Sequence, residues 1–225
     1  IMKKLSRLSK VSLMLAVLFA IDKLLGIFRQ MIISRQFQLS AELDVFNAAN
    51  NVPDMIFMLI SGGALALAFI PVLSEVLTRE GQQKSWSLFS NIVNIAFLVT
   101  AVLAILVAVF ARPLVSSNLG VAPGFTETQI EETVNLMRLN LVATLIFSVS
   151  GLVMSGLQAN QHFLLPALAP IFYDIGQIFG AMVLSPSSPI RIGPIQLPAL
   201  GLGTHGLVYG VILGAILHLL IQVPG

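Results

Sequence analysis

The stretch AIDKLLGIFRQMII, which runs from Ala20 to Ile33, places three charged residues inside a long apolar segment: Asp22, Lys23 and Arg29. A helix needs about 20 mostly apolar residues to cross the roughly 30 Å hydrocarbon core of a bilayer, and the apolar residues on both sides supply that length. Ionisable side chains inside such a helix are costly and usually face a protein interior or a watery cavity. The stretch therefore predicts a membrane-spanning helix whose charges are either functional or packed against other helices.

The composition of the whole chain also indicates an integral membrane protein. Hydrophobic residues make up 56% of the chain, charged residues make up 10%, and the mean hydropathy is +0.94. Typical soluble domains carry about 25% charged residues, so a soluble chain of this composition could not cover its own surface. The net charge of +2 is too small to indicate a nucleic-acid partner.

The motifs of familiar catalytic sites are missing from the sequence. The chain contains no G-x-S-x-G, P-loop or H-E-x-x-H pattern, and it contains no cysteine that could hold a metal. Asp44 and Asp54 are too far apart in sequence, with amides between them, to suit a magnesium site. We therefore expect no enzyme activity, no cofactor and no metal.

Apolar segments of membrane-spanning length recur along the chain and predict an all-α, polytopic membrane protein. Polar stretches rich in glycine, proline and serine separate them. The six expected helices cover residues 8–36, 43–77, 86–115, 131–157, 163–184 and 202–223.

The distribution of lysine and arginine predicts the orientation in the membrane. Six of these cations fall on the side of the N-terminus: Lys3, Lys4, Arg7, Lys10, Arg79 and Lys84. Three fall in the opposite loops: Arg35, Arg112 and Arg191. Because cytoplasmic loops carry the excess of positive charge, we expect a cytoplasmic N-terminus.

The charges of the first helix are expected to form one polar stripe. Asp22 and Arg29 are seven residues apart and project almost the same way, two turns apart. Lys23 and Gln30 form a parallel pair beside them, and Gly26 lies between. Two cations against one local acid suggest a site for an anionic headgroup, because lysine and arginine both bind phosphate oxygens.

The second segment opens DVFNAANNVPDMIF and carries a matching polar face. Its members follow a helical spacing: Asp44, Asn47, Asn51 and Asp54. Pro53 is expected to kink or break the helix, because it has no backbone N–H to donate. Gly62 and Gly63 are expected to serve as a second bend.

Two readings of this polar seam remain open. The polar side chains could line a solvated functional cavity, or they could only join the helices of a packed bundle. Arg138 in the fourth segment and Asp174 in the fifth are further cavity candidates, as are Asp22 and Asp54. Arg138 could equally extend toward the membrane surface, and Asp174 could equally pair with a basic neighbour.

Several stretches, taken in order, resemble one family. They are KLLGIFR, DVFNAANNVPDMIF, GGALALAFIPVLSE, APGF and NQHFLLPALAPIFYDI, spread over residues 23–175. The chain resembles the MurJ (MviN) lipid II flippases, of the multidrug/oligosaccharidyl-lipid/polysaccharide exporter superfamily. The resemblance implies that residues 1–225 form the N-terminal lobe of a two-lobed transporter, whose C-terminal lobe lies outside this chain.

The resemblance also implies a function and a set of site residues. The family moves undecaprenyl-pyrophosphate-linked peptidoglycan precursor from the inner to the outer leaflet of the bacterial cytoplasmic membrane by alternating access. Its partners would be membrane lipids and proteins of cell-wall synthesis, and its role would be in cell shape. The family pattern places cavity residues at Lys23, Gly26 and Arg29, an essential acid at Asp44, and a helix-bending proline at Pro53.

The sequence departs from the family pattern at several of these positions. Many members have arginine where Phe57 and Met58 stand, glutamate where Gly62 stands, and asparagine where Asp174 stands. Lys23 replaces an arginine and loses its two-pronged geometry. Two alternatives therefore stay open: an exporter of another lipid-linked polysaccharide, and a non-transporting membrane scaffold in cell-wall synthesis.

Overall fold

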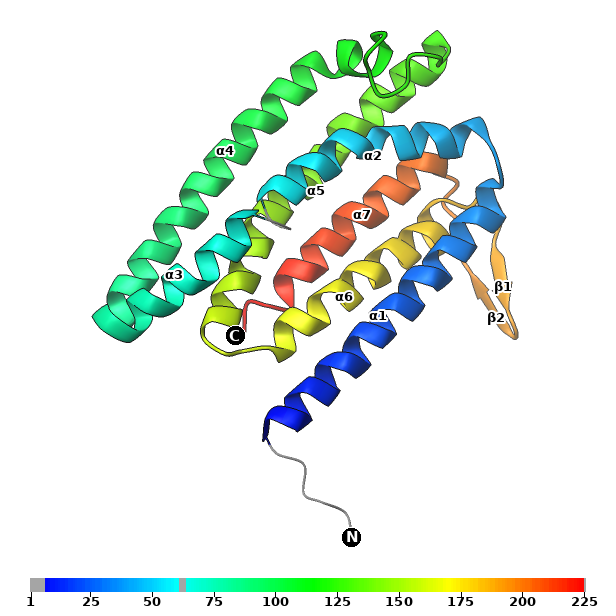
Figure 1. The fold of residues 1–225 in the computed structure, drawn as a ribbon. Coiled ribbons are helices and arrows are strands. Elements are labelled where there is room, and N and C mark those ends of the chain that lie inside the picture. Colours follow the sequence, from blue (N-terminus) through cyan, green and yellow to red (C-terminus); the bar gives the residue numbers. More distant parts are fainter. Residues whose placement is uncertain (1–6, 61–63, 225) are drawn as a thin grey trace.

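Helices account for nearly all of the structure, a computed structural model that describes residues 7–60 and 64–224 (Figure 1). Within these ranges there are seven α-helices, one π-helix and two short strands. In chain order they are α1 (Arg7–Phe37), α2 (Ala41–Ile60), α3 (Ala64–Glu80), α4 (Gln82–Ser116), α5 (Glu127–Ala159), α6 (Leu164–Phe179), η1 (Gly180–Leu184), β1 (Ile190–Ile192), β2 (Ile195–Leu197) and α7 (Gly203–Leu220).

Five helices of the described structure are long and apolar enough to cross a membrane. They are α1, α4, α5, the continuous α6–η1 segment and α7. The expectation of an all-α membrane protein is therefore confirmed, with five such helices where six segments were predicted. The difference lies in residues 43–77, which fall into α2 and α3. Two aspartates and three asparagines lower the hydropathy of α2, and α3 has only 17 residues.

The sequence predicted a kink or a break at Pro53, and the break does not occur: α2 continues through this residue to Ile60. Membrane helices tolerate proline where neighbouring groups satisfy the freed backbone carbonyl. Gly62 and Gly63, the other expected bend, lie outside the described residues. The helical path changes between the end of α2 and the start of α3, as Figure 1 shows.

Helix α5 is the centre of the bundle. It contacts α2, α3, α4, α6 and α7, and much of its length is buried. Its N-terminus is fixed by a capping box, in which the Thr126 hydroxyl accepts from the Gln129 N–H and the Gln129 side chain accepts from the Thr126 N–H. Helix α4 covers one side of α5 and presents an apolar outer face, which suits contact with lipid.

The continuous α6–η1 segment and α7 approach closely through glycines, which the sequence analysis did not single out. A Cβ added to Gly210 would lie 2.7 Å from the Cα of Gly180, and one added to Gly206 would lie 2.5 Å from the Ser185 nitrogen. Small residues spaced four apart let membrane helices pack backbone to backbone. The repeat of glycine at 176 and 180, and at 206, 210 and 214, was the signal for this contact.

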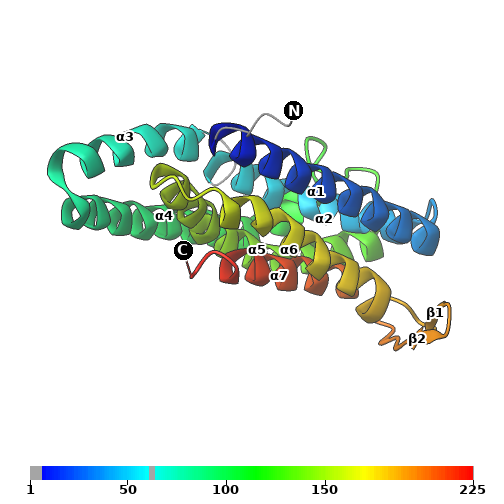
Figure 2. The ribbon, with the colours of Figure 1, turned by 90° about the horizontal axis from the view of Figure 1, so that it is seen from below.

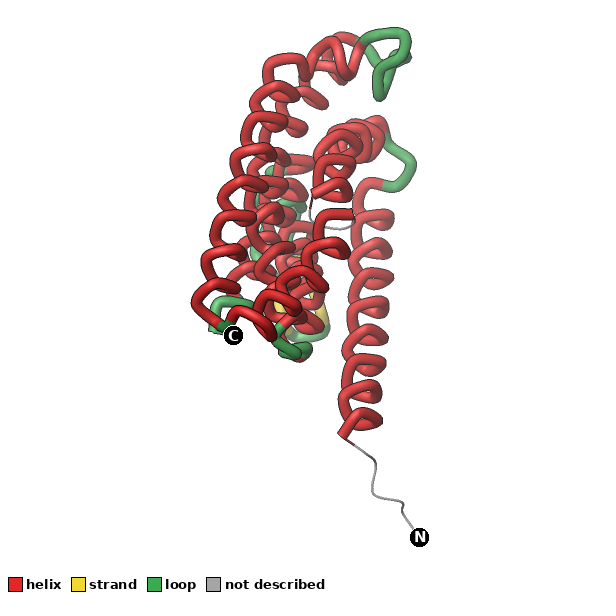
Figure 3. The backbone as a smooth tube through the Cα atoms, turned by 60° about the vertical axis from the view of Figure 1, so that its left-hand side comes forward, coloured by secondary structure: helices red, strands yellow, loops and turns green. Residues whose placement is uncertain are grey.

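Helices α1 and α2 lie along one side of the bundle, with α6 and α7 behind them (Figures 1 and 2). Helix α1 packs on α6 and η1, whereas α2 packs mainly on α5. Figure 3 shows α1 as the outermost helix on its side. The two polar helices therefore rest on different partners.

The connections fall at two ends of the bundle. The α3–α4 turn, the α5–α6 loop and the end of α7 lie at one end, and the α1–α2 and α4–α5 loops lie at the other (Figure 1). The stretch between η1 and α7, expected as a plain loop, contains an antiparallel hairpin of β1 and β2. Gly193 turns this hairpin with a φ of 59°.

Candidate functional site

The charged stripe of α1 faces α6, where it meets an acid from a distant part of the chain. Arg29 Nη1 donates to Asp174 Oδ1 at 2.8 Å, which joins positions 145 residues apart. The side chains of Arg29 and Asp174 are 25% and 8% exposed. Of the two roles left open for Asp174, the structure therefore shows pairing with a basic neighbour.

About two turns toward the N-terminus, a second pair lies on α1 itself. Lys23 Nζ is 3.2 Å from Asp22 Oδ2. The Asp22 side chain is 14% exposed, whereas that of Lys23 is 82% exposed. The predicted stripe is thus divided between a packed line that contains Asp22 and Arg29 and an outer line of Lys23 and Gln30.

Gly26 lies between the two pairs and brings α1 close to α6. A Cβ at this position would lie 3.6 Å from Asp174 Oδ2, which is an ordinary contact distance. The charges of Asp22 and Lys23 also act on Asp174 from α1. The two ion pairs therefore form one electrostatic cluster, here called the α1–α6 cluster: Asp22, Lys23, Arg29 and Asp174.

The polar face of α2 is mostly exposed, and its members are Asp44, Asn47, Asn51 and Asp54. Asn51 Nδ2 donates to the Asn47 carbonyl at 3.1 Å. Asn50, which widens the polar face, instead turns to α5 and accepts a hydrogen bond from Asn140. One amide of α2 therefore fixes the helix to the bundle, while the remaining polar groups stay accessible.

Tyr173 on α6 connects the polar faces of α1 and α2. The charges of Arg29 and Asp174 and that of Asp54 on α2 all act on its phenol. Its ring meets Phe147 edge-on, with centroids 5.0 Å apart, and Phe147 contacts Phe57 with centroids 4.9 Å apart. Neither Tyr173 nor these ring contacts were predicted as part of the site.

Two other predicted residues are not drawn into the α1–α6 cluster by the contacts found here. Arg138 Nε donates to the Ala108 carbonyl on α4 at 2.9 Å, so its side chain follows the α4–α5 contact. Asp44 lies exposed in the first turn of α2. Their roles in a cavity stay predictions.

The α1–α6 cluster has no net charge, because two cations face two carboxylates. It is therefore not a purely cationic surface. Its two cations differ in what they can still do: Arg29 is held against a nearly buried acid, whereas the ammonium of Lys23 is open to solvent. An anion approaching this surface meets Lys23 first.

Comparison with known proteins places the chain in a family. Residues 33–225 match the family model described as lipid II flippase MurJ. The chain is 29% identical, over 91% of its length, to the probable lipid II flippase MurJ of Buchnera aphidicola subsp. Acyrthosiphon pisum. It is 25% identical, also over 91%, to the lipid II flippase MurJ of Burkholderia cenocepacia. In both comparisons the chain spans 37% of the relative's length.

The fold agrees with this match. A solved structure of lipid II flippase MurJ in an inward closed conformation superposes with a TM-score of 0.63 and 18% identity, and it covers 94% of this chain and 41% of that one. The resemblance noted from the sequence is therefore confirmed over most of the chain: it belongs to the lipid II flippase MurJ family.

Proposed function

We propose that the protein carrying this chain is a lipid II flippase, which moves the undecaprenyl-pyrophosphate-linked peptidoglycan precursor from the inner to the outer leaflet by alternating access. Family membership supports the substrate class. The observation that carries the proposal is the exposed Lys23 ammonium beside the Arg29–Asp174 pair, within a membrane-spanning helix. Ionisable side chains at such a depth are costly and usually face a protein interior or a watery cavity, which supports a functional role for this cluster.

In this proposal Lys23 makes the first contact with the diphosphate. Arg29, fixed by Asp174, offers its remaining guanidinium N–H groups, since an arginine carries five donors and the ion pair uses few of them. Asn47, Asn51 and the acid Asp44 would contact the sugar-peptide portion or take part in gating. Gly26 has no side chain and so leaves space on α1 beside the two cations.

Movement of α2 would supply the change in access. Helix α2 contacts α5 through the Asn50–Asn140 hydrogen bond and through packing of Phe57 on Phe147. Pro53 removes one backbone hydrogen bond from the middle of this helix and so lowers the cost of bending there. No covalent chemistry is required, and we expect no metal or cofactor.

A complementation assay tests the proposal in the full-length protein. A bacterium depleted of its own flippase should be rescued by the wild-type gene and not by the Lys23→Ala/Arg29→Ala double variant, at equal membrane expression. The matched control is Arg79→Ala/Lys84→Ala. It removes two exposed cations beside the α3–α4 turn and should rescue fully. Full rescue by the first double variant would refute the cavity role.

The two alternatives predict different phenotypes. An exporter of another lipid-linked polysaccharide would leave lipid II levels unchanged when it is depleted, whereas a flippase would cause lipid II to accumulate on the cytoplasmic side. A non-transporting scaffold would bind proteins of cell-wall synthesis and would tolerate loss of both cations. Phe57 and Met58, which stand where many members have arginine, are the observation that favours testing the scaffold.

We further propose that the protein resides in the bacterial inner membrane with its N-terminus in the cytoplasm. The α3–α4 turn, which carries Arg79 and Lys84, lies at the same end of the bundle as the start of α1 (Figure 1). Arg35 near the end of α1, Arg112 near the end of α4 and Arg191 in β1 lie toward the other end. This separation supports the orientation expected from the positive-inside rule.

A further inference from the structure

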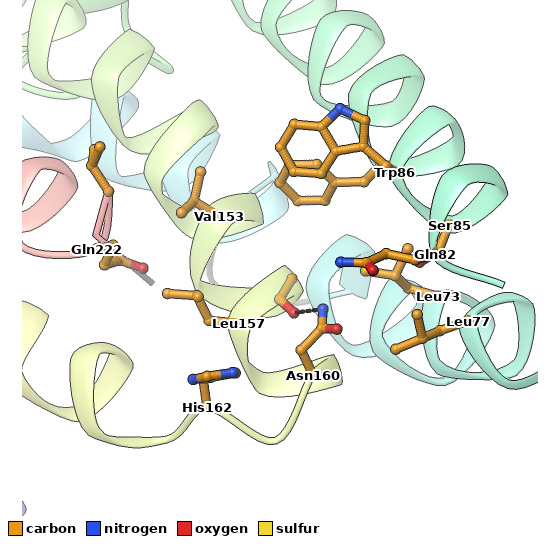
Figure 4. Close-up of a pocket in the computed structure, with 13 residues that line it drawn as sticks. Leu73, Leu77, Gln82, Ser85, Trp86, Val153, Leu157, Asn160, His162 and Gln222 are labelled. Atoms are coloured by element: carbon orange, nitrogen blue, oxygen red, sulfur yellow. Dashed lines mark hydrogen bonds between the residues drawn. The ribbon is translucent and has the colours of Figure 1, made fainter.

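A cavity lies away from the α1–α6 cluster, between α3, α4, α5 and the turn that follows α7. Its volume is about 400 Å³, and Figure 4 shows the residues around it. Apolar side chains make most of the wall: Leu73, Leu77, Trp86, Phe89, Val153, Leu157 and Val223. The polar members are Gln82, Ser85, Asn160, His162 and Gln222. We refer to it as the α3–α5 pocket.

The pocket contains a buried acceptor that lacks a partner. Gln222 is 1% exposed, and its Nε2 donates to the His218 carbonyl at 2.7 Å and to Ser150 Oγ at 2.9 Å. Its Oε1 has no hydrogen-bond partner among the described residues. Figure 4 shows this oxygen turned toward the other lining residues. Because a buried carbonyl oxygen without a donor is costly, it favours a ligand that brings an N–H or O–H.

The position of the pocket suits a lipid. It lies where α4 begins and α5 ends, at one end of two membrane-spanning helices. Trp86 is largely exposed, and its ring stacks on Phe89 with centroids 5.5 Å apart. Tryptophan concentrates at the boundary between hydrocarbon and headgroups, where its ring meets both. An amphiphile placed here would have its chain along the apolar wall and its headgroup near Gln222.

The charge of the lining selects among headgroups. The residues that line the pocket include no lysine, arginine, aspartate or glutamate. An anionic headgroup would find no cation to pair with, so a zwitterionic one fits better. Phosphatidylethanolamine carries an ammonium with three N–H donors, whereas the quaternary ammonium of phosphatidylcholine has none. The unpaired Gln222 Oε1 could therefore accept a hydrogen bond from phosphatidylethanolamine but not from phosphatidylcholine.

We propose that the α3–α5 pocket binds one phosphatidylethanolamine molecule, whose ammonium donates to Gln222 Oε1. This site is separate from the proposed path of the transported lipid and does not depend on the flippase assignment. Contacts between α5 and α7 continue from Gln222. Ser150 Oγ also lies 2.6 Å from His218 Nδ1, and the centroids of the His218 and Phe147 rings are 5.2 Å apart. A bound lipid would therefore stabilise the contact between α5 and α7.

Thermal unfolding of the full-length protein in detergent tests the site, with dioleoyl-phosphatidylethanolamine or dioleoyl-phosphatidylcholine as the titrated probe. We expect a saturable rise in Tm with the ethanolamine lipid and a much smaller one with the choline lipid. Gln222→Leu should weaken the apparent affinity for the ethanolamine lipid about tenfold, as expected for loss of a hydrogen bond to a charged group. Gln83→Leu, an exposed glutamine nearby that does not line the pocket, is the matched control and should keep the full response.

A second variant covers the case in which Gln222→Leu disturbs the Ser150–His218 contacts. Val153→Trp fills the pocket, keeps Ser150, His218 and Gln222 unchanged, and should abolish the response to the ethanolamine lipid. Equal responses to the two lipids, or an unchanged response in Val153→Trp, would overturn the proposal. It would also be overturned if the wild-type protein gave no response, which is the result expected if another segment of the longer chain fills the pocket.

Discussion

Separating the charges of Arg29 and Asp174 tests what holds α1 to the bundle. Their atoms lie 2.8 Å apart. At an effective dielectric constant of about 20, the Coulomb attraction over this distance is about 6 kcal/mol. Dehydration of the two ions offsets part of it, since only 8% of Asp174 and 25% of Arg29 remain exposed. We therefore expect a net coupling of about 3 kcal/mol between the two side chains.

The two single variants should differ in a definite order. Arg29→Met leaves the more buried carboxylate without a partner and should cost about 3 kcal/mol in the free energy of unfolding. Asp174→Leu leaves a cation that is partly hydrated and should cost about 2 kcal/mol. The double variant places Met against Leu, so it should lose only about 2 kcal/mol rather than the sum of the two.

Reversible unfolding of the full-length protein in mixed detergent micelles measures these values as a double-mutant cycle. The control cycle uses Glu75 and Arg79, an exposed pair one helical turn apart, whose coupling should stay below about 0.5 kcal/mol. If the Arg29–Asp174 cycle gave a coupling as small as this control, the ion pair would not fix α1 on α6. The reasoning about the α1–α6 cluster would then fail.

Three further predictions concern packing, capping and orientation. Gly210→Ala places a Cβ 2.7 Å from the facing helix backbone and should cost about 1–3 kcal/mol in the free energy of unfolding. Its control is Gly124→Ala, which has open space around it and should change this free energy by less than about 0.5 kcal/mol. Thr126→Ala removes the capping hydroxyl of α5 and should lower Tm through a loss of about 1 kcal/mol. Because this chain has no cysteine, a cysteine introduced at Gln83 should react with a membrane-impermeant thiol reagent only in inverted vesicles, and one at Pro123 only in intact cells; the reverse pattern would contradict a cytoplasmic N-terminus.

The sequence was enough to predict most of the membrane-spanning helices, because apolar segments of membrane length leave the backbone few alternatives to a helix. It also placed Asp22, Gly26 and Arg29 on one face, since that depends only on helical geometry. It could not pair Arg29 with Asp174. Asp174 is the only charge in its apolar segment and needed a partner, whereas Arg29 shares its segment with Asp22 and Lys23, and spacing along one helix says nothing about which distant helix supplies a partner.

Other features depended on contacts between helices and were missed for the same reason. Tyr173 looked like an ordinary apolar-segment residue until the fold brought its phenol within range of the charges of Arg29, Asp174 and Asp54. The glycines of α6 and α7 had a readable spacing, but only the packed pair shows that Gly180 faces Gly210. The uninterrupted α2 shows the opposite case: Pro53 gave a strong local signal for a kink or a break, and the helix nevertheless continues through it.

The neutral balance of the α1–α6 cluster bears on how a lipid diphosphate would be handled. A surface with two unpaired cations would bind the diphosphate tightly and release it slowly, whereas transport requires both entry and release. Asp174 fixes one cation in place, and Asp22 lies beside the other without burying it. The diphosphate would then compete with Asp22 for Lys23, so binding is weakened by the ion pair that has to be given up. We therefore expect Asp22→Asn to tighten substrate binding and slow transport. Asp174→Asn should weaken binding, because Arg29 would no longer be held in place by its ion pair. Measuring binding and transport separately in the full-length protein distinguishes an acid that tunes the site from one that only cancels charge.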